Sequence, residues 1–287
     1  MDPNNIHLPV TVVDTKTKRL FRLDRFLGKG TSGSVFECTV LETGLKHAIK
    51  VIGKEQLQNS EEVDEMWNEI KVHGSLKHTN ICGFVDSFED DENYYILMEL
   101  CNNGSLQNRL NQNKRKGLDE SEVKRIMMQL IQAVQFMHDK NIMHHDLKPD
   151  NIFLDQEGNV KLGDFGLAVQ LASSDETLIY QAGTHLFMAP EMIEWKRHSF
   201  EADIWSLGVI LYCLLTGKCP FRGVFQMLFQ RIVKGEYKFP DTMSFDAKDL
   251  ISSMLQADPA DRPSLEEISC HEFFTGISSG VKRQRFE

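Results

Sequence analysis

Residues 28–40 read GKGTSGSVFECTV, a G-x-G-x-x-G sequence that runs directly into a strand pattern beginning at Val35. Glycine adopts backbone conformations that other residues avoid, and it lets a main chain approach a phosphate group closely. The dinucleotide-binding form of this motif opens a helix, whereas here a strand follows. A glycine-rich loop between two strands is typical of a lid over nucleotide phosphates. An ordinary turn is the alternative, and this stretch alone does not exclude it.

Downstream of this loop, a further strand pattern ends in Lys50, and Glu69 lies in a predicted helix that begins near Ser60. A lysine at the end of that strand could reach nucleotide phosphates if an acidic side chain held it in place. Glu69 is the natural partner, with Glu65 and Glu62 as alternatives. A lysine–glutamate pair chosen from sequence is usually a chance surface pair, so it is the glycine-rich loop that favours the functional interpretation.

Residues 144–151 read HHDLKPDN and carry the strongest local signal. Asp146 could accept or orient the proton of an attacking hydroxyl, and Lys148 could neutralise a transferring phosphoryl group. Asn151, together with Asp164 of the Asp-Phe-Gly sequence that follows, offers the hard oxygen ligands that Mg²⁺ prefers. The pattern therefore predicts ATP and Mg²⁺ as cofactors and phosphoryl transfer as the chemistry.

Composition excludes several other classes of protein. The chain has 287 residues and a formal net charge of −10, which argues against nucleic acid as the main partner because phosphate binding depends on dense Lys and Arg. Its six cysteines form no C-x-x-C pair, so neither a zinc site nor a disulfide framework is predicted and a reducing compartment is favoured. The N-terminus resembles no secretory signal. The longest apolar stretch, 204–215, is shorter than the ~20 residues of a membrane span and predicts a buried helix.

The periodicity of the chain predicts a strand-rich N-terminal part and a helical C-terminal part that join near 99–104. Residues 1–20 are polar and without a clear period, and they are predicted to be an N-terminal extension. Asp119 and Glu122 predict a capping box at the start of a helix. The strand patterns occupy 20–27, 34–41, 45–52, 81–88 and 94–100, and the clearest helical patterns occupy 123–137 and 203–215.

Taken in order, these motifs resemble the eukaryotic protein kinases over about residues 21–275. The resemblance implies an α+β, bilobal protein-kinase fold. It divides the chain into a small antiparallel-sheet N-lobe with one helix (21–98), a hinge (99–104), a larger and mainly helical C-lobe (105–275) and a short C-terminal tail (276–287). Residues 146–151 with Gly183-Thr184 look like a serine/threonine kinase rather than a tyrosine kinase. The family pattern also implies that Glu191 pairs with Arg262. It further implies that Asp203 holds the backbone of the catalytic loop, residues 144–151.

The roles of individual residues are inherited from this resemblance. It implies that the catalytic residues are Asp146, Lys148, Lys50, Glu69 and Thr184, and that Asn151 and Asp164 are the metal ligands. The implied nucleotide-binding residues are Leu27, Gly28, Lys29, Gly30, Gly33, Ser34, Val35, Ala48, Lys50, Met98, Glu99, Cys101 and Phe153. Within that set Met98 is the gatekeeper, Glu99 and Cys101 offer hinge backbone hydrogen bonds, and Val35, Ala48 and Phe153 enclose the adenine.

Among kinases, the polo-like kinases are the most similar, on segments such as Glu69-Ile70-x-x-His73, Leu100-Cys101 and 198–206. This resemblance implies an intracellular, cytoplasmic or nuclear protein with a cell-cycle role at the nucleus or spindle poles. It implies protein substrates and a monomeric catalytic domain, with no nucleic acid or membrane partner. An Aurora- or NIMA-type kinase is the alternative within the family. A catalytically silent ATP-binding scaffold is the alternative outside enzymes.

The sequence departs from the polo-like pattern at several positions. About twelve residues follow Thr275 in this sequence, so we expect it to contain no polo box. His145 replaces the usual arginine between His and Asp, and Tyr180 stands where the phosphorylated threonine is expected. We therefore hypothesise that the activation segment, here residues 173–184, orders without phosphorylation. His185 replaces the usual proline, and Gly33 replaces the alanine that polo-like kinases usually carry.

Overall fold

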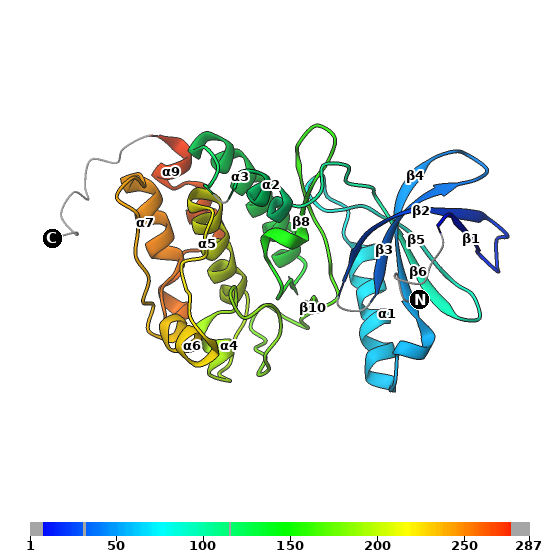
Figure 1. Cartoon of the computed structure of the whole chain (residues 1–287). Helices are drawn as coiled ribbons and strands as arrows, with labels where there is room; N and C mark the ends of the chain where they lie inside the picture. The colour runs from blue at the N-terminus through cyan, green and yellow to red at the C-terminus, as the bar shows by residue number, and fades with distance from the viewer. Residues whose placement is uncertain (1–7, 31–32, 115, 277–287) are drawn as a thin grey trace. The chain divides into compact units, whose positions relative to one another are not determined.

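The chain folds into two compact units, and the computed structural model in Figure 1 describes residues 8–30, 33–114 and 116–276. The first unit comprises residues 1–104 and 153–170, and the second comprises 105–152 and 171–287. The resemblance to protein kinases assigns 153–170 to the helical C-lobe, but this segment groups with the first unit. Its short strands supply hydrogen bonds to the main chain near residues 80–104, a pairing between distant segments that local periodicity does not reveal.

The first unit is built on a six-stranded antiparallel sheet with the order β1-β2-β3-β4-β6-β5. The strands are β1 (Val10–Val13), β2 (Leu20–Lys29), β3 (Ser34–Val40), β4 (Lys46–Gly53), β5 (Phe84–Glu89) and β6 (Asn93–Met98). The register pairs Val35 of β3 with Lys50 of β4, and Ala48 of β4 with Met98 of β6. Predicted nucleotide-binding residues from three strands are thereby brought side by side.

Strand β1 forms where no strand is predicted from the sequence. The pattern of residues 1–20 predicts an extension, yet Val10–Val13 pairs with β2, with Val12 opposite Phe21. Val12 is buried and belongs to the same hydrophobic cluster as Phe21, Leu23 and Phe36. Four residues are too few for a period of two to stand out, so pairing with a neighbouring strand decides the structure here.

The core of the sheet is held by aromatic packing. The ring of Phe88 stacks against Phe21 at 4.8 Å between centroids and against Tyr95 at 4.6 Å. Phe21 and Tyr95 are fully buried, and rings of this size contribute a large share of the hydrophobic stabilisation of a core. These rings belong to the same buried hydrophobic cluster as Phe36 of β3 and Ile49 of β4.

Helix α1 (Ser60–Ser75) begins where the sequence predicts. The side chain of Asn59 accepts a hydrogen bond of 2.9 Å from the backbone N–H of Glu62, which satisfies one of the free donors of the first turn. The helix buries Met66, Glu69 and Val72 on one face. A carboxylate buried in this way requires a partner of opposite charge, because an isolated charge away from water is costly.

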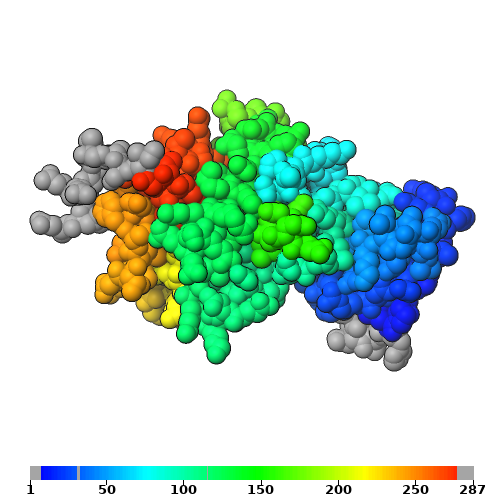
Figure 2. Space-filling view, turned by 90° about the horizontal axis from the view of Figure 1, so that it is seen from above, coloured from blue at the N-terminus to red at the C-terminus, as the bar shows by residue number. Residues whose placement is uncertain are grey.

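The second unit is mainly helical. Its helices are α2 (Leu106–Gln112), α3 (Glu120–His138), α4 (Pro190–Ile193), α5 (Glu201–Thr216), α6 (Phe225–Val233), α7 (Phe245–Met254), α8 (Leu265–Ser269) and α9 (Glu272–Thr275). Helix α5 is buried on nearly all sides, as its apolar run predicts. A Cβ added at Gly208 of α5 would lie 2.9 Å from side-chain atoms of Met254 and Leu255, so this glycine permits close approach of the end of α7. In Figure 2 the red segment of α9 lies beside the orange segment of α7 and the green segment of α3.

The remaining regular elements are short. They are the strands β7 (Ile142–Met143), β8 (Ile152–Leu154), β9 (Val160–Leu162) and β10 (Val169–Gln170), and the 3₁₀ turns η2 (Lys54–Gln56), η3 (Pro149–Asn151) and η4 (Pro259–Asp261). Strands β8 and β9 pair with each other. Within the described ranges, no helix combines the length and the apolar character that a membrane span requires.

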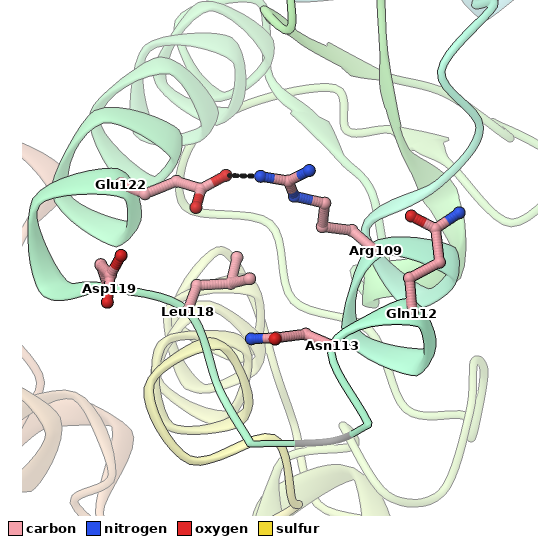
Figure 3. A pocket seen from close by; sticks show the side chains of 6 residues that line it. All are labelled: Arg109, Gln112, Asn113, Leu118, Asp119 and Glu122. Carbon is pink, nitrogen blue, oxygen red and sulfur yellow. Dashed lines mark hydrogen bonds and ion pairs between the residues drawn. The ribbon is translucent and has the colours of Figure 1, made fainter.

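The capping box predicted at Asp119 and Glu122 is wrong. Asp119 does precede α3, but its side chain makes no capping hydrogen bond. Glu122 instead forms an ion pair of 2.9 Å with Arg109 of α2, as Figure 3 shows. A cation supplied by a neighbouring helix competes with the local backbone for the carboxylate, and a sequence window does not contain that cation.

Candidate active site

In the first unit, the close approach of the glycine-rich loop to β4 explains why the third glycine of the motif, Gly33, is needed. The backbone N–H of Gly30 donates to the carbonyl of Gly33 at 2.8 Å. A Cβ added at Gly33 would lie only 2.4 Å from the carbonyl oxygen of Val51, so the loop can pass this close to β4 only with glycine there. Gly33 is therefore required by the packing of this chain. Thr31 and Ser32 lie outside the described residues.

Lys50 and Glu69 form the predicted ion pair. The Lys50 ammonium donates to both Glu69 carboxylate oxygens, at 2.6 and 2.9 Å, and each side chain is only 5% exposed. The two alternative partners are wrong, because Glu65 is exposed and Glu62 accepts from the backbone N–H of Gln58. Removing one member of a buried pair leaves an uncompensated charge, so each residue fixes the position of the other.

Asp164 lies close to this pair, in the same unit. Its carboxylate is 3.8 Å from the Lys50 ammonium. A Cβ added at Gly166 would lie 3.4 Å from Glu69 Oε2 and 3.6 Å from Asp164 Oδ1, so the chain turns tightly past both carboxylates. Asp164 itself has a φ of 61°, which non-glycine residues rarely adopt. Lys50 is therefore held between two carboxylates, one of them a predicted metal ligand.

His73, for which the sequence motifs indicate no function, makes positioning contacts in the first unit. Its ring Nε2 lies 2.8 Å from the carbonyl oxygen of Cys82, and its ring centroid is 4.7 Å from that of Phe165. Burial lowers the pKa of His73 to about 4, so the ring is neutral at physiological pH. The neutral ring packs against Phe165, the residue that follows Asp164. Its signal in the sequence is its place one helical turn after Glu69, on the buried face of α1.

The predicted adenine-binding segment also lies within the first unit. The backbone N–H of Glu99 donates to the Gly83 carbonyl at 2.8 Å, and the Glu99 carboxylate accepts from the Gly83 N–H at 3.0 Å. The Glu99 carbonyl accepts a weak bond from the Cys82 thiol at 3.5 Å, which leaves it a second lone pair for a ligand. A Cβ added at Gly163 would lie 3.1 Å from the Phe153 ring. Glycine at this position therefore leaves space for Phe153, which is predicted to enclose the adenine.

In the second unit, Asp146 is the centre of a closed network of hydrogen bonds. Its Oδ1 accepts from the backbone N–H of Thr184 at 2.9 Å and from the Thr184 hydroxyl at 2.8 Å. Its Oδ2 accepts from the Lys148 ammonium at 2.6 Å and from the Asn151 amide at 3.0 Å. Lys148 also donates to the Thr184 hydroxyl at 2.9 Å. Four predicted site residues from 146–151 and 184 are thus brought together, with the Asp146 carboxylate fully oriented.

Asp203 of α5 holds the loop that carries Asp146. Its carboxylate accepts from the backbone N–H groups of His144 and His145, at 3.0 and 3.1 Å, and pairs with the His138 ring at 2.9 Å. Burial by itself would raise the pKa of Asp203, but the hydrogen bond and the charge of His138 bring it down to about 2. The predicted backbone role of Asp203 is confirmed.

The predicted pairing of Glu191 with Arg262 is also confirmed. The guanidinium donates to both carboxylate oxygens, each at 2.7 Å, and the two side chains are almost completely buried. Arg262 donates further to the Glu201 carbonyl at 2.8 Å. This pair ties the segment after α7 to α4 and to the start of α5, so its contribution is structural.

A cavity of about 410 Å³ lies elsewhere in the second unit. It is lined by Arg109, Gln112, Asn113, Leu118, Asp119 and Glu122, which Figure 3 shows around the Arg109–Glu122 ion pair. The residues that line this cavity include no predicted catalytic, nucleotide-binding or metal-ligating residue. It is therefore separate from the candidate active site.

The residues predicted to hold a metal are compatible with Mg²⁺. Asn151 donates through its amide nitrogen to Asp146, which leaves its amide oxygen as the group able to ligate a cation. The Asp164 carboxylate offers a second hard oxygen. Across the described segments, no group of three or more His, Cys, Asp and Glu residues could hold a metal by itself. Each of these two oxygen groups, taken in its own unit, is of the chemical type that Mg²⁺ prefers, and Mg²⁺ also keeps water and substrate phosphates in its coordination shell.

Comparison with known proteins gives one family for most of the chain. The family described as "Protein kinase domain" matches residues 21–274. "Serine/threonine-protein kinase PLK1" of Xenopus laevis is 39% identical over 269 residues, which are 93% of this chain and 45% of the relative. "Cell cycle serine/threonine-protein kinase CDC5/MSD2" of Saccharomyces cerevisiae is 38% identical over 96% of this chain and 42% of the relative. "Serine/threonine-protein kinase PLK4" of Xenopus tropicalis is 37% identical over 90% of this chain and 27% of the relative. The chain thus spans less than half the length of these relatives.

Proposed function

Because the chain belongs to the protein kinase family, we propose that it is a serine/threonine protein kinase that transfers the γ-phosphoryl group of ATP to hydroxyl groups of proteins. The observation that carries the proposal is the Asp146 network, in which Lys148, Asn151 and Thr184 all bond the same carboxylate. A carboxylate positioned by this many donors is suited to orienting a hydroxyl nucleophile.

In the proposed reaction, the second unit acts on the protein substrate. The substrate hydroxyl oxygen forms a bond to the γ-phosphorus while the bond to the β–γ bridging oxygen breaks, which yields phosphoprotein and ADP. Asp146 orients the hydroxyl and accepts its proton as transfer proceeds. Lys148, held by Asp146 and Thr184, neutralises charge on the transferring group. Positioning and electrostatic stabilisation supply most of the acceleration in reactions of this type.

The first unit is proposed to hold the nucleotide. Lys50, fixed by Glu69, binds the α- and β-phosphates, and the glycine-rich motif that contains Gly28, Gly30 and Gly33 contributes to phosphate binding. Val35, Ala48 and Phe153 are proposed to enclose the adenine, with Met98, Glu99 and Cys101 at its edge. Protein kinases as a family use ATP with Mg²⁺, and we assign Asp164 and Asn151 as its ligands here. When bound, Mg²⁺ neutralises charge on the phosphates.

The names of the relatives support a narrower proposal. They include polo-like kinases and a cell-cycle kinase, so we propose a polo-like kinase that acts on protein substrates in the cell cycle, in the cytoplasm or nucleus and at spindle poles. The family excludes neither an Aurora-like nor a NIMA-like specificity. Phosphorylation of peptide libraries by this chain and by a polo-like kinase domain, compared position by position, distinguishes these specificities.

The proposal is tested by ATP-dependent phosphorylation of casein by the purified chain. An Asp146→Asn variant should lose activity by about 10³-fold or more, because it removes the oriented carboxylate. Asp241→Asn is the matched control, since Asp241 is an exposed carboxylate of the same unit. Equal activity of Asp146→Asn and the wild type would reject the proposed role. A chain that binds ATP but never transfers phosphate would be a scaffold.

A further inference from the structure

Three aromatic rings of the second unit link the activation segment to the catalytic loop. The Tyr180 hydroxyl lies 3.1 Å from His145 Nδ1. The ring centroids are 5.4 Å apart for His145 and Tyr180, 5.5 Å for Tyr180 and His198, and 5.3 Å for His145 and His198, with the rings edge to face in each pair. Edge-to-face contacts at these separations are favourable. We call His145, Tyr180 and His198 the three-ring cluster.

We propose that Tyr180 and His145 are positioning residues, whose contact holds the activation segment against the catalytic loop so that Thr184 reaches Asp146 without a phosphate on the segment. This inference rests on the proposed kinase function and states what maintains the contact between Thr184 and Asp146 in the proposed site. The remaining contacts of the cluster show why one ring can have this effect.

On one side of the cluster, the chain before Tyr180 is fixed to the chain around His198. The backbone groups of Leu178 and His198 exchange two hydrogen bonds of 3.0 Å, and the Ser199 hydroxyl donates to the Glu176 carbonyl at 3.1 Å. His198 is 2% exposed, and burial lowers its pKa, so a neutral ring closes the cluster. The segment therefore enters the cluster from a defined position.

On the other side, the chain after Tyr180 packs closely against the backbone of His145. A Cβ added at Gly183 would lie 2.3 Å from the His145 carbonyl oxygen, and Gly183 has a φ of 91°, which glycine tolerates. The His145 N–H in turn donates to Asp203 at 3.1 Å. Thr184 follows Gly183, and Asp146 follows His145. These two residues make the hydrogen bonds of the proposed site. A displaced Tyr180 ring would thus release the segment within four residues of Thr184.

A second contact of the segment defines the competing explanation. Arg197 donates to the Thr177 hydroxyl at 3.0 Å, and both residues are exposed. A phosphate on Thr177 would meet the Arg197 guanidinium, which is the usual charge-assisted way of ordering such a segment. The three-ring cluster instead joins a phenol to two imidazoles, and its geometry is complete with an unmodified tyrosine. The two explanations make opposite predictions for the phosphate-free protein.

The experiment uses the full chain made in bacteria and treated with phosphatase, with intact mass confirming that no phosphate remains. Tyr180→Phe keeps the ring and removes the hydroxyl, Tyr180→Ala removes both, and Tyr212→Phe is the matched control. Tyr212 donates its hydroxyl to the Lys238 carbonyl elsewhere in the unit. The measurements are kcat, the KM for ATP, the KM for a peptide, and hydrogen exchange of the amides in 176–184.

We expect the phosphate-free wild type to be active. Tyr180→Phe should lower kcat about 3- to 10-fold, because it loses one hydrogen bond. The KM for ATP should not change. Tyr180→Ala should lower kcat further and speed amide exchange in 176–184, while Tyr212→Phe matches the wild type. An unaltered melting temperature would show that the loss is local to the segment.

The inference is overturned if the phosphate-free wild type is inactive and recovers when Thr177 is phosphorylated. It is equally overturned if both Tyr180 variants match the wild type in kcat and in exchange. If the wild type is inactive in every phosphorylation state, the proposed function fails. Exchange of 176–184 still tests the cluster in that case, since unchanged exchange in Tyr180→Ala rejects it.

Discussion

The Thr184 hydroxyl donates a 2.8 Å hydrogen bond to the Asp146 carboxylate, across thirty-eight residues of chain. The Thr184 N–H bonds the same oxygen at 2.9 Å, and Lys148 donates to the Thr184 hydroxyl at 2.9 Å. One hydroxyl therefore connects the proposed base to the proposed phosphate-neutralising cation. Substitution of Thr184 should therefore affect both the proposed base and the proposed phosphate-neutralising cation.

Replacing Thr184 with alanine should lower kcat about 10- to 100-fold, because hydrogen bonds to charged groups are each worth about 1.5–3 kcal/mol. The KM for ATP should change little, since the proposed nucleotide contacts lie in other residues. Thr184→Ser keeps the hydroxyl and should retain most activity. Steady-state kinetics on a peptide substrate measure the difference, and equal kcat for the alanine and serine variants would refute the role of the hydroxyl.

Replacing Glu69 with glutamine should raise the KM for ATP and lower kcat, together by about 10-fold or more in kcat/KM, because Lys50 loses the charged partner that holds it. The matched control is Glu65→Gln, an exposed carboxylate on the same helix. Titration of ATP in the kinase assay separates the two variants. A Glu69→Gln protein with wild-type ATP kinetics would contradict the assigned role of the pair.

Replacing Arg262 with methionine should lower the free energy of unfolding by about 3–5 kcal/mol, because Glu191 would remain buried and unpaired. The double variant Glu191→Leu/Arg262→Met should recover much of this loss, since replacing both charges with apolar groups removes the unpaired charge. Lys218→Met, which removes an exposed cation, is the control. Urea unfolding measures all four proteins, and the idea fails if the double variant is as unstable as the single one.

The stability of the fold should fall at acid pH through Asp203. Its pKa is about 2 in the folded chain against an ordinary value of 3.8. A folded-state pKa that is depressed stabilises the protein above the unfolded value, and this stabilisation is lost as pH falls from about 4 towards about 2. Unfolding free energies measured across that range should fall less steeply for Asp203→Asn than for the wild type. Parallel curves for the two proteins would be inconsistent with the shifted pKa.

Replacing Gly33 with alanine should destabilise the first unit by about 1–3 kcal/mol, because the added methyl group meets the Val51 carbonyl and the strand must shift. Gly28→Ala is the matched control for stability, since a Cβ at Gly28 has no atom within 4 Å. The melting temperatures of the two variants can be compared directly. A Gly33→Ala protein as stable as Gly28→Ala would show that the loop and β4 separate without cost.

Much of the site could be predicted because its chemistry is written in short motifs. Glu69 could be named as the natural partner of Lys50 from its place in the predicted helix after the glycine-rich loop. The structure then excludes Glu65 and Glu62, because of the three glutamates only Glu69 lies on the buried face of α1. The loop contacts of Asp203 and the Glu191–Arg262 pair follow from the resemblance to a known family. These predictions succeed because neighbouring residues or inherited roles define them.

Other features could not be predicted because they depend on chain segments that are distant in sequence. Strand β1 depends on pairing with β2, and the lost capping box at Asp119 depends on Arg109 of another helix. The need for glycine at position 33 depends on the Val51 carbonyl. The partners of Tyr180 come from residues 145 and 198, and no period or motif connects them.

The order of residues establishes which chemical groups the protein has and roughly where its strands and helices lie, because local periodicity and short motifs depend on neighbouring residues. The tertiary structure alone decided which groups share a hydrogen bond, which carboxylate is buried and which ring meets which, because packing brings together residues that the chain keeps far apart. Asp146 is a candidate base from its motif, but its orientation comes from Thr184. His145 departs from the family pattern in sequence, and only packing against Tyr180 and His198 gives that departure a physical meaning.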